Sequence, residues 1–190
     1  MLKKFRYWFV NVYWYHYRLH TAAVLFAAIL TAFAIHSVVT RVVPDVNLTL
    51  ASDKPIGSPQ ADLLTAYWNE TRGIVAGSST LYLSEEEMLN WELLHVSFVD
   101  EERNLYIIGE GLREFFSQIP ELFVPAAELG LPADPELPFL VPLAGSPVMD
   151  RAGLSGEAMF GLIKNPKEGS EADAKRRDIA AQCLRDVLNG

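Results

Sequence analysis

Residues 21–40 read TAAVLFAAILTAFAIHSVVT, and this stretch decides how the rest of the chain is arranged. It contains neither proline nor glycine, and His36 is its one ionisable side chain. Twenty helical residues at about 1.5 Å each cover about 30 Å, the thickness of a bilayer's hydrocarbon core. The sequence therefore predicts a transmembrane helix over 21–43. The side chains expected to anchor it in lipid are Thr21, Leu25, Phe26, Ile29, Leu30, Phe33, Ile35, Val38 and Val39.

The residues before this stretch are basic and aromatic. Eight of the first twenty residues are aromatic, and the first acidic residue of the chain is Asp45. Four bases precede the stretch and Arg41 alone follows it, which predicts a cytoplasmic N-terminus and an outer segment 45–190. Aromatic rings interleaved with bases favour the headgroup layer, so 1–20 is predicted to be an interfacial segment, helical over 5–20. The residues expected to set the topology and contact the interface are Lys3, Lys4, Arg6, Trp8, Trp14, Tyr15 and Arg18.

A cleaved signal peptide is the alternative to a retained anchor. Ala32, Phe33 and Ala34 have the small-x-small pattern that signal peptidase requires. However, the apolar residues continue through Val42 and Val43, and the N-terminal region is unusually long and aromatic for a signal peptide. We therefore favour the retained anchor, and cleavage after Ala34 stays open.

Length and charge limit what the chain can be. It has 190 residues, half of them hydrophobic, which is enough to bury the core of one domain. All 24 acidic residues and 11 of the 16 basic residues follow Pro44, so that part has a formal net charge of −13. This charge disfavours nucleic acid as a partner, because no basic face is available to displace counterions. The single cysteine, Cys183, excludes an internal disulfide and a multi-cysteine metal cluster.

The sequence after Pro44 alternates strands with helices. Strands are predicted where apolar residues alternate or form short runs, and helices where they recur every three to four residues. The predicted strands are 45–51, 80–83, 105–108 and 158–163, and the predicted helices are 60–71, 84–98, 110–118 and 171–188. Seven of the eleven prolines lie within 120–147, which predicts an extended connection there. The alternation favours one small extracytoplasmic α/β domain over 45–190, with a mostly parallel sheet.

Few residues in the chain suggest chemistry. A glycine-rich phosphate loop, an HExxH motif and an EF-hand loop are absent from the sequence. His16 and His20 share a helical face, but no carboxylate or cysteine lies close enough in sequence to complete a metal site. Cys183 falls on the apolar stripe of the last helix, where a free cysteine is usually a core residue. We therefore predict no enzyme and no catalytic, cofactor-binding or metal-binding residue; a hydrolase using Asp100 or Glu110 is the enzymatic alternative.

Several stretches of the chain resemble known kinds of bacterial protein. YWYHYRLH (13–20) and TRVVPDVNLTLAS (40–52), on either side of the apolar run, resemble small uncharacterised membrane-anchored proteins of Firmicutes. LNWELLHVSFVDEERNLYIIGEGLREFFSQIPELFVPAAELG (89–130) and FGLIKNPKEGSEADAKRRDIAAQCLRDVLNG (160–190) resemble parts of an extracellular solute-binding protein. Solute-binding proteins have two lobes, and the 146 residues of 45–190 suffice for about one, so the resemblance implies a reduced module and transfers no binding residue.

These observations favour a single-pass protein of the bacterial cell membrane whose outer domain acts by binding or scaffolding. Its expected partners are the lipid bilayer and another membrane or envelope protein or a second copy of itself, with no nucleic acid and no cofactor. The alternative, implied by the resemblance, is a reduced solute-binding module that delivers a small ligand to a membrane transporter.

Overall fold

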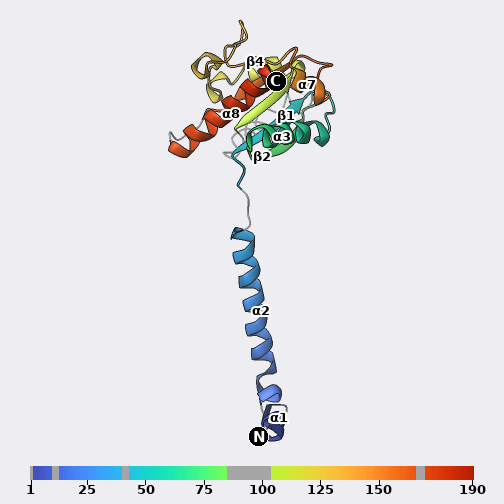
Figure 1. Ribbon diagram of the computed structural model, residues 1–190, viewed down its shortest axis with the longest axis vertical. Coiled ribbons are helices and arrows are strands. Elements are labelled where there is room, and N and C mark those ends of the chain that lie inside the picture. Colours follow the sequence, from blue (N-terminus) through green and yellow to red (C-terminus); the bar gives the residue numbers. More distant parts are fainter. Residues whose placement is uncertain (1, 10–12, 40–42, 85–103, 166–169) are drawn as a thin grey trace. The chain divides into compact units, whose positions relative to one another are not determined.

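The computed structural model describes the whole chain except residues 1, 10–12, 40–42, 85–103 and 166–169. It forms two compact units, Met1–Val43 and Pro44–Gly190, which are described separately below (Figure 1). The predicted helix 84–98 lies almost wholly outside the described residues, and so does Asp100.

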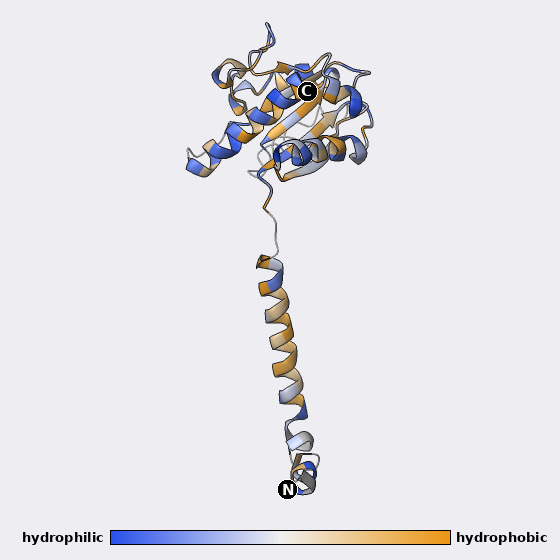
Figure 2. Cartoon of the chain, viewed as in Figure 1, coloured by the Kyte–Doolittle hydropathy of each residue, from blue (hydrophilic) through white to orange (hydrophobic). Residues whose placement is uncertain are grey.

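The first unit consists of helices α1 (Leu2–Trp8) and α2 (Trp14–Val39). Within α2, the 23 residues Tyr17–Val39 are long and apolar enough either to cross a membrane or to serve as a signal sequence, and none of their most apolar window is buried. Figure 2 shows the apolar residues along the length of this helix. The prediction of an N-terminal apolar helix is therefore confirmed. All the predicted anchor residues lie on α2, and all except the half-buried Thr21 are exposed.

Aromatic rings follow one another along the start of this unit. The ring centroids of Phe9 and Tyr13 are 5.3 Å apart, and those of Tyr13 and Tyr17 are 5.6 Å apart. The hydroxyl of Tyr13 also shares a hydrogen bond of 3.0 Å with the Thr21 hydroxyl. Tyr17 lies four residues after Tyr13 and Thr21 lies eight residues after it, which are spacings that place side chains on one helical face. Rings with a polar tip suit the boundary between water and lipid.

The second unit is built on a five-stranded sheet with the order β2-β1-β3-β5-β4. The strands are β1 (Val46–Ser52), β2 (Ala76–Tyr82), β3 (Leu105–Gly109), β4 (Val141–Pro142) and β5 (Met159–Ile163). β1 is parallel to both β2 and β3, whereas β5 is antiparallel to both β3 and β4. The prediction of an α/β domain is confirmed, but the prediction of a mostly parallel sheet is wrong, because the sheet is mixed.

The connection between β3 and β5 explains why β5 runs in the opposite direction to its neighbours. It first crosses to the far end of the sheet, where the Val124 N–H donates to the Ile163 carbonyl at 2.9 Å. It then turns back through the 3₁₀ helix η4 (Ala126–Leu129), and β4 follows. The connection thus passes along the sheet twice, once to the far end and once back through β4, which is antiparallel to β5. The chain therefore enters β5 from the end at which β3 stops.

Helices cover both faces of the sheet. One face packs against α3 (Ser58–Arg72), α7 (Pro147–Arg151) and α8 (Glu171–Asn189), which confirms the predicted helices 60–71 and 171–188. On the other face, the predicted helix 110–118 is replaced by a 3₁₀ turn, η2 (Glu110–Leu112), and one short helix, α6 (Arg113–Phe116).

The aromatic rings of Tyr106, Phe116 and Phe123 fill the second face. Phe123 lies edge-on to Tyr106 at 6.0 Å and contacts Phe116 at 5.5 Å. Since each of these rings is almost completely buried, the proline-rich connection is part of the core rather than a surface loop. The extended connection predicted over 120–147 is therefore packed, with 3₁₀ turns at η3 (Pro120–Leu122) and η4.

Polar contacts join α3 to α8. The indole N–H of the fully buried Trp68 donates to the Cys183 carbonyl at 3.2 Å. One turn further along each helix, Arg72 donates two hydrogen bonds to the Asp186 carboxylate, at 3.0 and 2.8 Å. This two-pronged pairing fixes the relative position of the helices more closely than a single ion pair would.

A buried carboxylate organises the proline-rich connection. Asp134 Oδ1 accepts hydrogen bonds from the N–H groups of Glu136 and Leu137, each at 3.0 Å, and from Arg113 Nη2 at 2.6 Å. Burial acts to raise the pKa of Asp134, but the two backbone donors and Arg113 outweigh it and hold that pKa below its ordinary value. Asp134 therefore stabilises the fold in its ionised form.

We expect Asp134→Asn to destabilise the second unit by about 2 kcal/mol at neutral pH, because the charge-assisted bond to Arg113 is lost. A lowered pKa contributes stability above the ordinary value of 3.8, and that contribution disappears as the pH falls through the folded-state pKa. The variant should therefore lose less stability than the wild type on acidification from neutral pH. Urea unfolding of the full chain in detergent, measured across that range, checks this.

The matched control for this prediction is Glu136→Gln. Glu136 also binds Arg113, at 2.9 Å, but its side chain is 77 % exposed, so the change should cost under about 0.5 kcal/mol. Equal losses in the two variants would contradict a special role for Asp134.

Candidate functional site

The carboxyl ends of β1 and β3 form the first candidate site. After β1 the chain turns to β2 on one side, and it later returns to β3 on the other side. Ligands of open α/β sheets bind beyond the carboxyl ends of the strands at such a reversal. We call this place the β1/β3 edge, and its residues are Ser52, Asp53, Lys54, Gly109, Glu110, Gly111 and Glu157.

Two glycines allow the edge to pack closely. A Cβ atom added at Gly111 would lie 2.1 Å from Asp53 Oδ2, so the Asp53 carboxylate lies directly against the Gly111 backbone. A Cβ atom at Gly109 would lie 3.2 Å from the Ser52 hydroxyl and 3.4 Å from Glu157 Oε2. Any side chain at position 111 would displace Asp53, so this glycine is needed for the arrangement.

Lys54 is surrounded by carboxylates at this edge. Its ammonium pairs with Glu157 from the segment before β5. The hydrogen bond and charge of Glu157 raise the pKa of Lys54 above its ordinary value, and the charges of Asp53 and Glu110 act in the same direction. Lys54 is therefore an ammonium at neutral pH, in charge contact with Glu157.

Two small adjoining pockets open beside the Lys54–Glu157 pair. One, of about 260 Å³, is lined by Lys54, Gln60 and Glu157 among others, and the second measures about 300 Å³. Both share Leu154, Gly156, Glu157 and Met159. The side-chain oxygen of Gln60 is buried there and accepts no hydrogen bond from the part of the chain that the structure describes. The pockets thus combine an ammonium, a carboxylate and an amide.

The start of α3 faces the same pockets. Its N-cap is Gly57, which supplies no side chain to satisfy the first N–H groups, and a proline occupies the first turn. Such a helix start favours negatively charged groups. The β1/β3 edge therefore combines the ammonium of Lys54 and the start of α3 with the carboxylates of Asp53 and Glu157.

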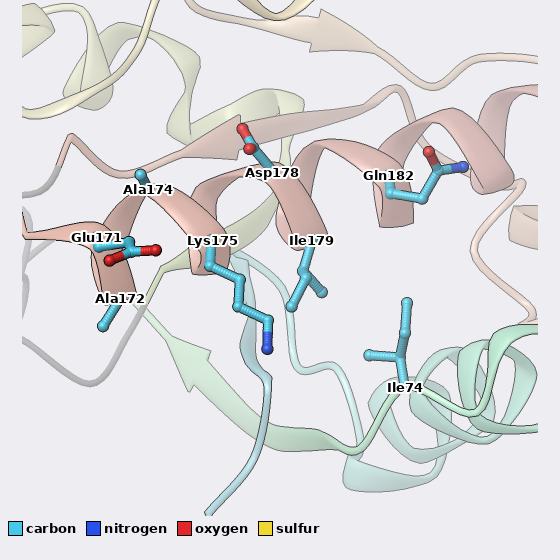
Figure 3. Close-up of a pocket in the computed structure, with 8 residues that line it drawn as sticks. All are labelled: Ile74, Glu171, Ala172, Ala174, Lys175, Asp178, Ile179 and Gln182. Carbon is cyan, nitrogen blue, oxygen red and sulfur yellow. The ribbon is translucent and has the colours of Figure 1, made fainter.

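A second hollow, the α8 groove, lies on the first half of α8. It has a volume of about 910 Å³ and opens widely to solvent. Its lining residues are Ile74, Glu171, Ala172, Ala174, Lys175, Asp178, Ile179 and Gln182. Figure 3 shows the Lys175 and Ile179 side chains reaching toward Ile74, while Asp178 points away. Its shallowness is more typical of surface relief than of an enclosed ligand site.

The residues considered in the sequence lie in separate places. Glu110 is exposed at the β1/β3 edge, where its charge contributes to raising the pKa of Lys54. Cys183 is buried in the core on α8. Among the residues that the structure describes, no group of three or more His, Cys, Asp and Glu could hold a metal ion.

Sequence reasoning missed the Lys54–Glu157 pair, whose members are 103 positions apart. One indication was present: Ser52, Asp53 and Lys54 directly follow the first predicted strand. Polar residues at that position of an α/β domain are typical of binding sites.

No family model matches the chain, and neither a curated protein nor a solved structure matches it significantly. The resemblance to Firmicutes membrane-anchored proteins and to solute-binding proteins therefore stays a prediction.

We expect Cys183 to be unreactive while the protein is folded. Burial, with the charges of Asp186 and Asp45, raises the pKa of its thiol to about 12. Alkylation of the full chain by iodoacetamide at pH 8 should therefore be about a thousandfold slower than in urea. The control is Leu63→Cys in a Cys183→Ala background, since Leu63 is exposed on α3. Labelling of Cys183 at the control's rate would contradict its placement in the core.

Proposed function

We propose that the chain is a single-pass membrane protein that presents residues 44–190 outside the cytoplasm as a binding or scaffolding module. The observation that carries this proposal is the apolar helix Tyr17–Val39, which is exposed along its length and is followed by a separately packed domain. An exposed helix of this composition would be unstable in water, and lipid is the solvent that it fits.

The distribution of charge supports the proposed orientation. Lys4 and Arg6 stand on exposed helix positions before Tyr17–Val39, Arg18 is exposed at the start of that segment, and acidic residues begin only at Asp45. Bases are retained on the cytoplasmic side of a membrane span, so the domain would be translocated.

The polar groups of the β1/β3 edge favour binding over catalysis. Lys54 is held as an ammonium by Glu157, and the Asp53 carboxylate lies against the Gly111 backbone. The Asp53 carboxylate is therefore engaged in packing, and Lys54 is engaged in charge pairing, with a raised pKa where proton transfer by a lysine would need a lowered one. We propose that the module is not an enzyme.

Single-cysteine labelling tests the orientation. In a Cys183→Ala background, Glu136→Cys should react with a membrane-impermeant maleimide in intact cells, because Glu136 is highly exposed in the outer domain. Tyr7→Cys, which keeps every N-terminal base, should react only after the membrane is opened. The opposite pattern would contradict the proposed topology. Intact mass of the native protein tests retention, since cleavage after Ala34 would shorten the 21.2 kDa chain.

A second candidate function, capture of a small ligand for delivery to a transporter, is favoured by the pockets of the β1/β3 edge. Their combined charges suit a small zwitterion: its anionic group would meet Lys54 and the start of α3, and its ammonium would replace Lys54 as the partner of Glu157. The side-chain oxygen of Gln60, which has no partner among the described residues, would accept an N–H of the ligand.

We expect free α-amino acids, used as zwitterionic probes, to raise the melting temperature of the full chain in detergent. A probe at about 100 times its Kd stabilises the folded state by about 2.7 kcal/mol. Lys54→Met and Glu157→Gln should each abolish the shift, while Lys175→Met in the α8 groove should preserve it. No shift with any probe, or a shift that survives both edge variants, would contradict this function.

A further inference from the structure

The two edges of the sheet are protected very differently. β4, at one edge, is only two residues long and includes Pro142. β2, at the other, has the seven-residue sequence AGSSTLY, with no charge and no proline, and pairs with β1 in unbroken register. Natural proteins shield edge strands with short length, proline, lysine or bulges, because a bare edge recruits another strand. β4 has the first two devices, and β2 has none of them.

The hydrogen-bonding groups along the outer side of β2 can be identified from the ladder. The Leu83 N–H donates to the Ser52 carbonyl at 3.0 Å, so Leu83 faces β1. In a parallel ladder alternate residues face the same neighbour, so Gly77, Ser79 and Leu81 also direct their backbone groups toward β1. The remaining members direct theirs outward: Ala76, Ser78, Thr80 and Tyr82. Within the described ranges, β1 is the only strand that pairs with β2.

Exposed large apolar side chains also lie on or beside β2 and on the neighbouring helix α3. Of the described residues after Pro44, the exposed large hydrophobic ones are Leu63, Val75 and Tyr82. Val75 and Tyr82 bracket β2, and Leu63 lies on α3, which packs beside that strand.

We propose that the outer edge of β2 pairs antiparallel with β2 of a second copy of this chain. The pairing would be centred on Ser79, which would lie opposite Ser79 of the other copy. Around this centre Ser78 meets Thr80, Gly77 meets Leu81 and Ala76 meets Tyr82. This register uses the whole strand, and every outward-facing residue meets another outward-facing residue, as an antiparallel ladder requires.

The strand is complementary to its own reverse. Ala76 lies opposite Tyr82, and Gly77 lies opposite Leu81. Each large side chain therefore packs over a residue with a small side chain or none. Four hydrogen-bonded pairs would form about eight N–H···O bonds, two per pair. The strand carries no charge, so no like-charged side chains oppose one another within the ladder, and the repulsion between two domains of net charge −13 arises outside this strip. A two-fold symmetric contact between two copies requires a strand that is complementary to itself. Pairing with an unrelated peptide would place no such requirement on β2.

This inference goes beyond the proposed function and does not depend on it, because the edge is a property of the domain alone. It is tested with the full chain in detergent micelles and in native membranes.

Disulfide trapping tests the register. In a Cys183→Ala background, Ser79→Cys should form a covalent dimer under mild oxidation, since the two Cα atoms of a directly opposed, non-hydrogen-bonded pair lie about 4.5 Å apart. Thr80→Cys should cross-link poorly, because position 80 faces position 78 of the other copy. Glu136→Cys, whose side chain is 77 % exposed in the proline-rich connection, measures random collision. Cross-linking at Ser79 no faster than at Glu136 would overturn the proposal.

A proline tests the edge itself. Thr80→Pro removes an outward N–H without touching the ladder to β1, so it should weaken the dimer at least about tenfold in sedimentation experiments. Thr80→Val keeps the N–H and should preserve the dimer. Protection of Cys183 from alkylation shows that each variant is folded. A chain that is monomeric at every concentration, or a dimer that Thr80→Pro leaves unchanged because α2 or another surface holds it, would overturn the proposal.

Discussion

Burial of the central strands on both faces is the constraint on which the domain depends. Leu50 of β1 packs toward α3 and α8, Tyr106 of β3 packs toward the proline-rich connection, and neither is exposed to solvent. A strand buried on both faces cannot carry a charge along its length, because an unpaired buried charge is too costly. Asp53, Lys54 and Glu110 therefore follow the last residues of their strands. The burial that holds the sheet together is also what concentrates polar groups at the β1/β3 edge.

The sequence predicted the elements better than their directions. Apolar periodicity identified the strands 45–51 and 105–108 and the helices 60–71 and 171–188, because periodicity follows directly from which side chains face the core. Periodicity contains no information on strand direction, so the alternation of elements suggested a parallel sheet. The reversal of β5 depends on the path of residues 120–147. The prolines of this segment were recognised, but its path depends on contacts between residues distant in sequence, such as Val124 with Ile163.

The candidate site was less predictable than the apolar helix for a related reason. Suitability for lipid is a local property of twenty consecutive residues, and it can be read from composition alone. The β1/β3 edge joins Lys54 to Glu157, and Glu157 reaches it only because β5 is reversed and begins beside the end of β3. An error in one strand direction would move that carboxylate to the other end of the sheet, so the site could not be predicted before the topology was known.

The reversal of β5 also explains why the two edges of the sheet differ. The proline-rich connection that turns the chain back ends in β4, and its Pro142 closes that edge. β2 arises from an ordinary β-α-β crossover, which buries the face of the sheet, and among the described residues no strand other than β1 pairs with it. Antiparallel pairing through β2 would extend the sheet on the side of β1 away from β3. The β1 strands of the two copies would then run in opposite directions, and the two β1/β3 edges would lie at opposite ends of the joined sheet. Ligand binding and pairing would therefore use separate surfaces.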